Sequence, residues 1–164
     1  MPPLLEMTSQ PCDGENQIRN LLQCILYFKN GNPSDARLRL AEFIMEGRIK
    51  EYDPGTAYTL LCLWSNYDGI RDYRLGECVL RGIGTDRDPI VALKLLEEAL
   101  DRLDSTLYFL DRDDEFTIKE VEESFHDRKD YEKACEKTKE YIEEAKGEIC
   151  KMSEYDIMHC HSGL

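Results

Sequence analysis

The sequence lacks long apolar runs and an excess of basic residues. Its purely apolar stretches are only a few residues long, whereas a membrane-spanning helix needs about 20. Residues 1–6 have neither the basic flank nor the long apolar stretch of a secretory signal. The 34 acidic residues outnumber the 21 Lys and Arg, which gives a net charge of −13. Because binding to nucleic-acid phosphates needs clustered cations, we expect neither a membrane nor a nucleic acid as a direct partner.

Paired cysteines are also missing. The seven cysteines are an odd number, and none are spaced as Cys-x-x-Cys. Together with the absence of an export signal, this predicts reduced thiols and a cytoplasmic protein. Cys24, Cys62, Cys78 and Cys135 lie within amphipathic patterns, where cysteine acts as a small apolar side chain.

No signature of an enzyme is present. The only histidines are His126, His159 and His161, and nucleophilic catalysis needs a Cys or Ser beside such a base. We expect His126 at the end of an acidic helix, where it would interact with the last carbonyls. Gly82-Ile-Gly84 lacks the Lys-Ser/Thr of a phosphate-binding loop. We therefore predict no catalytic activity and no cofactor.

Two segments have metal-ligand side chains without the spacing of a metal site. Asp111–Glu122 nearly matches a calcium loop, but Phe116 stands where the sharp turn needs glycine. An acidic turn that caps the next helix is the better interpretation. The cysteines and histidines of residues 150–161 are too close together in an extended tail to converge on one ion. A metal-dependent enzyme is therefore the least favoured hypothesis.

Apolar residues at helical spacing recur along the chain, and no alternating strand pattern appears. Asn or Asp precedes Pro at 32–33, 53–54 and 88–89. Proline is tolerated in a first helical turn and the preceding side chain can accept hydrogen bonds from its amides, so each pair predicts a helix start. Thr117 and Glu120 have the spacing of a capping box. The predicted fold is all-α, with helices over about 16–29, 33–46, 54–66, 70–81, 89–103 or 89–110, 117–125 and 128–152.

Residues 36–65 repeat in residues 71–100. An ungapped offset of 35 gives nine identities in these 30 positions, including both Asp-Pro pairs. Each unit reads as a helix, a glycine-containing loop, an Asp-Pro start and a second helix. Because one helical pair cannot bury both of its faces, the units are expected to stack. Small residues fall where the paired helices must approach closely, at Ala41, Ala57, Gly76 and Ala92.

The second copy resembles a Sel-one-like repeat, a relative of the tetratricopeptide repeat. The motif elements are Leu75-Gly76, Gly82-x-Gly84, the acidic Asp86, and the alanines Ala92 and Ala99. The first copy departs from this pattern at Ala41 and Ile49. The resemblance implies a short α-solenoid of stacked antiparallel helical hairpins that binds other proteins without catalysis.

The repeat divides the chain into three parts. We expect a mobile leader over 1–15, a single helical-repeat domain over 16–152 and a flexible tail over 153–164. The domain would consist of units at about 36–70 and 71–106, closed by capping helices over 107–152.

Polar positions on the first helices are the candidate partner-binding residues. Their spacing places each set on one helix face, opposite the leucines, and the first helices of such solenoids line the concave surface. The alternative is that these side chains are only solvated. The two sets are Arg39, Glu42 and Glu46, and Arg74, Glu77 and Arg81.

Two binding roles fit the sequence. One is an adaptor or scaffold that holds another protein or peptide. The other is an acidic inhibitor or immunity protein that neutralises a basic enzyme, because acid is concentrated in residues 97–156 and would complement a basic partner. A solvated outer face explains the same charge. The oligomeric state stays open.

Overall fold

The structure, a computed structural model, describes residues 19, 20, 23, 33–63, 68–152, 154 and 158. This part of the chain is all-helical and contains no strand, which confirms the predicted all-α class. Of the predicted helix 16–29, only residues 19, 20 and 23 are described, and each of them is helical, while the leader over 1–15 and most of the tail lie outside the described residues. The helices are α2 (Pro33–Met45), α3 (Gly55–Cys62), α4 (Gly69–Arg81), α5 (Pro89–Asp111), α6 (Glu115–Glu123) and α7 (Arg128–Cys150).

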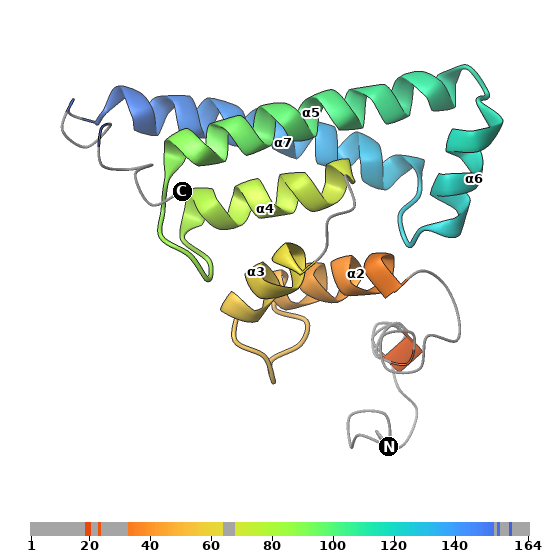
Figure 1. Cartoon of the computed structure of the whole chain (residues 1–164), viewed down its shortest axis with the longest axis horizontal. Helices are drawn as coiled ribbons and strands as arrows, with labels where there is room; N and C mark the ends of the chain where they lie inside the picture. Colours follow the sequence, from red (N-terminus) through yellow and green to blue (C-terminus); the bar gives the residue numbers. More distant parts are fainter. Residues whose placement is uncertain are drawn as a thin grey trace.

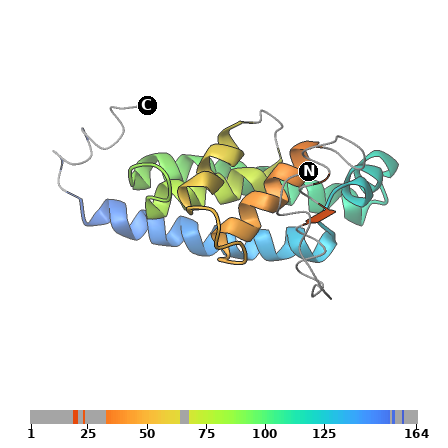
Figure 2. The ribbon, with the colours of Figure 1, turned by 90° about the horizontal axis from the view of Figure 1, so that it is seen from below.

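The helices form two hairpins and a long returning helix (Figure 1). α2 pairs with α3, and α4 pairs with the much longer α5. The short α6 turns the chain at the end of α5, so that α7 runs back along α5 and also contacts α4. Seen from below, α7 extends along one side of the molecule, with α2 and α3 beside α4 (Figure 2). In the described residues, no helix is long and apolar enough to cross a membrane.

The helices of the second hairpin begin and end close to their predicted bounds. The Asp68 side chain accepts a hydrogen bond from the Ile70 amide at 2.8 Å, which starts α4. Gly82 ends α4 in the left-handed conformation, with φ 72°, which costs glycine little. The Asp88 side chain accepts from the amides of Ile90 and Val91, both at 3.1 Å. α5 then continues to Asp111, close to the later of its two predicted ends.

The first Asp-Pro pair behaves differently. The side chain of Asp53 caps nothing at the start of α3, whose N-terminal flanking residue is Pro54. Instead, the Asp53 carbonyl oxygen accepts from the Thr56 amide at 2.8 Å. The predicted side-chain cap is therefore wrong here, because the turn is closed by backbone alone.

The capping box predicted at Thr117 is also wrong. Asp114 starts α6 instead, since its side chain accepts from the amide and hydroxyl of Thr117 at 3.0 and 2.8 Å. A reciprocal capping box does occur at the start of α7, where Asp127 and Asp130 each accept from the other's amide at 2.9 Å. The acidic segment thus caps helices, as predicted from its poor match to a calcium loop.

The small residues of the repeat lie at the helix contacts. Ala41, Ala57 and Ala92 are fully buried. A Cβ atom on Gly76 would lie only 2.8 Å from two side-chain carbons of Leu96, so α4 and α5 pack with no room for a methyl group there. The predicted close approach is confirmed. The cap is part of the same core, because Tyr131, Ala134 and Cys135 of α7 pack in one apolar cluster with α2 and α4.

Candidate functional site

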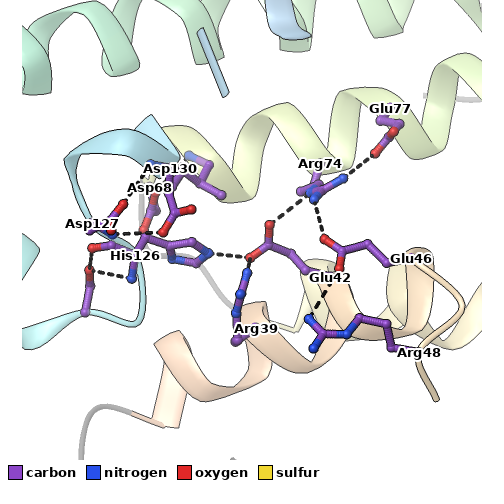
Figure 3. Close-up of polar contacts among 12 residues, drawn as sticks. Arg39, Glu42, Glu46, Arg48, Asp68, Arg74, Glu77, His126, Asp127 and Asp130 are labelled. Atoms are coloured by element: carbon purple, nitrogen blue, oxygen red, sulfur yellow. Dashed lines mark hydrogen bonds and ion pairs between the residues drawn. The ribbon is translucent and has the colours of Figure 1, made fainter. Parts of the chain in front are cut away.

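Arg74 lies at the centre of an ion-pair network between α2 and α4 (Figure 3). Its Nε donates to Glu42 Oε2, its Nη2 to Glu46 Oε1 and its Nη1 to Glu77 Oε2, all at 3.1 Å. Arg39 also donates to Glu42, at 3.4 Å. Five of the six predicted partner-binding residues therefore bind one another.

The carboxylate of Glu42 is buried within this network. Its side chain is only 4% exposed, and it accepts from Arg39, Arg74 and Nε2 of His126. Burial alone would raise the pKa of Glu42, but the hydrogen bond from His126 and the neighbouring positive charges outweigh burial and lower this pKa to about 2. Glu42 is thus a buried anion that needs all its partners, since an unpaired buried charge is costly.

Glu77 and Arg81 connect α4 to α7. The Tyr141 hydroxyl donates to Glu77 Oε1 at 2.6 Å. The Arg81 guanidinium donates to both oxygens of Glu144, at 2.8 and 3.1 Å. Tyr73 stacks on Tyr141 with ring centroids 6.1 Å apart. These contacts fix the direction of α7 along α4.

The six candidates do not form one open face. Glu42 and Glu77 are buried, at 3% and 9% exposure, and Arg74 is mostly enclosed by its carboxylates. The expectation of a solvent-facing set is wrong for these residues, and so is the alternative that all six are only solvated. Glu46 and Arg81 are exposed, and partner binding through them stays a prediction.

The prediction that His126 interacts with the last carbonyls of a helix is wrong, because its ring makes a different contact. The ring is buried and its Nε2 pairs with Glu42, while Nδ1 has no protein partner. Burial alone would lower the pKa of His126, but the hydrogen bond to Glu42 and the charges of Glu42 and Asp68 raise it. Burial, together with the charge of Asp68, raises the pKa of Asp35 to about 6. The carboxylates of Glu42 and Asp68 therefore favour the protonated form of the ring.

The buried thiols have the properties of core side chains. Burial raises the pKa of Cys78 to about 12 and that of Cys135 to about 11. At neutral pH both are thiols rather than nucleophilic thiolates. The Ser124 hydroxyl, two residues from His126, lies 2.8 and 2.9 Å from the backbone oxygens of Val121 and His126. The polar groups around His126 are thus engaged in holding the chain.

The described residues hold no group of three or more His, Cys, Asp or Glu side chains placed to bind a metal ion. In the segment that resembles a calcium loop, Asp111 pairs with Arg128 and Asp114 caps α6. Of the tail ligands, His159, Cys160 and His161 lie outside the described residues.

A cleft of about 510 Å³ opens between the end of α5, α6 and the start of α7. Both apolar side chains and carboxylates line it, and the buried His126 also contributes to its wall. Sequence reasoning did not find this feature, because its walls come from three elements that helical periodicity treats separately. The lining residues are Leu110, Asp113, Ile118, Val121, Glu122, Ser124, Phe125, His126, Asp127, Arg128 and Asp130.

The sequence did contain a signal for the ion-pair network. The pattern Arg-x-x-Glu occurs in both units, and the intrahelical pairs Arg39–Glu42 and Arg74–Glu77 both form, at 3.4 and 3.1 Å. Residues three apart on a helix are neighbours, so this spacing favours an ion pair. The contact between His126 and Glu42 joins residues 84 apart, and no local pattern could predict it.

No family model matches this chain, and neither the curated proteins nor the solved structures contain a match to it.

Proposed function

We propose that the chain is a non-catalytic protein-binding module of the Sel-one-like type, in which two helical hairpins form a short solenoid capped by α7. The observation that carries the proposal is the equivalence of the hairpins at an offset of 35 residues. Ala41 and Gly76 are buried at the same point of the first helices, and Ala57 and Ala92 at the same point of the second. Hairpins that repeat in this way form extended binding surfaces by stacking.

Protein binding is supported by the exposed apolar side chains at one end of the molecule. Of the six large apolar side chains that are exposed in the described residues, Tyr108, Phe109, Phe116 and Phe125 lie within residues 108–125. Exposed apolar side chains that concentrate in one region typically mark an interaction site.

The acidic inhibitor is the second candidate, and the net charge of −13 favours it. In this role the partner is a basic enzyme whose active surface the module covers. Electrostatic attraction between opposite charges accelerates such encounters and makes them sensitive to salt.

The test is capture of partners from the native host by the immobilised chain at low salt, followed by reconstitution of a defined complex from the purified proteins. We expect one protein to co-sediment with the chain in analytical ultracentrifugation. Failure of every captured protein to form a complex when purified contradicts the proposal. Steeply weaker affinity in high salt, with loss of the partner's activity in the complex, selects the inhibitor over the adaptor.

The contribution of the first helices is tested with Glu46→Ala and Arg81→Ala. Both side chains are exposed, but Arg81 pairs with Glu144 and Glu46 with Arg74, so circular dichroism must first show that the variants stay folded. Arg74→Ala is unsuitable, because Arg74 holds three carboxylates and its loss would disturb the fold. Unchanged affinity in both variants would exclude this face as the binding site.

A further inference from the structure

The cleft beside α6 has open apolar walls. Leu110, Ile118 and Val121 line it only partly buried, and Phe125 is 37% exposed. Phe116, on the first turn of α6, is 70% exposed. Burying a side chain of this size against a partner is favourable, because it removes apolar surface from water. The cleft thus offers room and apolar contact for one large side chain.

Negative charge surrounds these apolar walls. Residues 108–130 contain nine acidic and four basic residues. The basic residues are largely occupied: Arg128 pairs with Asp111 and Glu132, Arg112 stacks over the Tyr108 ring at 3.4 Å, and Lys119 pairs with Glu123 at 3.8 Å. Four carboxylates line the cleft itself, those of Asp113, Glu122, Asp127 and Asp130.

One buried polar atom belongs to a residue of this wall. His126 is 3% exposed and contributes to the lining, and its Nδ1 has no protein partner. Buried polar atoms in proteins are almost always hydrogen-bonded. The ring therefore has one hydrogen-bonding position that no described protein group satisfies.

We propose that this cleft binds a basic segment of a protein partner, with one apolar side chain of the segment in the cleft and its Lys or Arg side chains on the surrounding carboxylates. The inference rests on the proposed protein-binding function and specifies its surface and the chemistry of the partner. The acidic rim complements a cationic peptide. The same rim opposes anionic lipid headgroups, and it opposes a second copy of this chain, whose equivalent surface has the same charge.

The first test is a titration of the ¹⁵N-labelled full chain with a 14-residue amphipathic peptide of Lys and Leu that contains one Trp. We expect saturable binding, with amide shift changes concentrated in residues 108–130. The affinity should fall at least about tenfold between 0.05 and 0.5 M salt, because screening weakens contacts between exposed charges. Two peptides serve as controls, one with Glu in place of Lys and one with Ser in place of Leu and Trp, and both should bind far more weakly.

Charge reversal localises the effect. Glu122→Lys places a cation in the cleft wall and should weaken peptide binding about tenfold, which corresponds to about 1.4 kcal/mol. Glu97→Lys changes the same charge on an exposed position of α5. At a rise of about 1.5 Å per residue, this position is about 18 Å along the helix from Phe109. It should change the affinity less than about twofold. Circular dichroism confirms that both variants stay folded.

Three outcomes overturn the inference. Shift changes centred on another acidic surface, equal weakening by Glu122→Lys and Glu97→Lys, or preferential binding to phosphatidylserine vesicles would each do so. The captured partner separates this failure from that of the proposed function. If it binds the wild type and Glu122→Lys equally well, the cleft is excluded while the module stands. If no captured protein forms a complex with the chain, both proposals fail.

Discussion

The two repeat units occupy equivalent positions in the sequence but are stabilised differently. The second unit, α4 and α5, is covered by α7, and Leu96 packs with Ile142 and Ala145 in an apolar cluster. The first unit, α2 and α3, shares apolar contacts with α4 and is also connected to it by the ion pairs of Glu42 and Arg74. The repeat therefore sets where the helices of each unit lie, while the helices packed against the unit determine which contacts stabilise it.

The loops of the two units differ in the same sense. Gly47 and Gly82 both end a first helix at φ 72°. Beyond this point the first unit has the buried Ile49, where the second has Gly84, whose backbone packs against Gly55. The Gly-x-Gly form of the loop thus serves the contact between units, and the first unit has no preceding described unit to contact.

The largest effect is expected for Glu42→Ala. Removing this carboxylate leaves Arg74 and His126 without their buried partner, and breaking a buried charge pair costs about 3–5 kcal/mol. We expect a fall of this size in the free energy of unfolding by urea. In hydrogen exchange, α2 and α3 should lose protection before α5 and α7. The exposed Glu97→Ala is the control and should change stability by less than about 0.5 kcal/mol. Equal loss of protection in both units would show that the network does not hold the first unit separately.

Leu96→Ala is the matched change in the second unit. Leu96 is fully buried against Gly76, and such truncations cost about 2–5 kcal/mol. Here we expect α4, α5 and α7 to lose protection together, because they share this cluster. Leu63→Ala, at a side chain 61% exposed, should have little effect on the urea midpoint. A Leu96→Ala variant in which α2 alone opened would contradict the difference between the units.

Gly84→Ala should destabilise more than Gly47→Ala. Both positions have φ 72°, which costs a residue with a side chain about 1–2 kcal/mol. A Cβ on Gly84 would also lie 2.8 Å from the Gly55 oxygen, whereas one on Gly47 meets nothing within 4 Å. We expect a loss of about 2–4 kcal/mol at Gly84 and about 1–2 kcal/mol at Gly47, measured by thermal unfolding. Equal losses would mean that the loops of the two units do not need their close contact.

The helix bounds of the second unit could be predicted from the sequence far better than the charged contacts between helices. The second unit is capped by residues that act within a few positions of the groups they cap, namely Asp68, Gly82 and Asp88. Such local effects can be predicted from the sequence. Asp53 has the same local pattern as Asp88 but no cap, because the loop around Gly55 closes differently. The burial of Glu42 depends on His126, which the fold brings from the segment before α7. Long-range pairings of this kind lie beyond periodicity and capping rules.

The buried histidine should make stability depend on pH. The pKa of His126 is raised above 6.5, so the stability it contributes is complete below that pH and is lost as pH rises through the native pKa. The pKa of Asp35 is raised from 3.8 to about 6, so this group also makes the protein less stable as the pH rises between those two values. The pKa of Glu42 is lowered from 4.5 to about 2, so the stability that its carboxylate contributes is lost as the pH falls between those two values.

We therefore expect the highest urea midpoint near about pH 4.5, a decrease up to about pH 6 as Asp35 ionises, and a further fall above about pH 6.5 as His126 loses its proton. The fall should be smaller than the loss in Glu42→Ala, because Glu42 keeps Arg39 and Arg74 when His126 becomes neutral. His126→Gln should flatten the curve above pH 6.5 while lowering it at pH 6. The histidines at 159 and 161 are unchanged in this variant, so a persistent fall would assign the effect to groups other than His126.

The smallest effect on stability is expected at the two Asp-Pro helix starts. Asp88→Ala removes two hydrogen bonds to the first amides of α5, and loss of such a cap costs about 1 kcal/mol. Asp53→Ala removes a side chain that makes no capping bond at α3, so the midpoint of thermal unfolding should barely move. The two substitutions delete the same side chain from the same position of the repeat. A difference between the two losses of stability would show that the structural surroundings, and not the position in the repeat, determine whether the aspartate caps a helix. Equal losses at both positions would instead mean that the Asp53 side chain stabilises the first unit in solution.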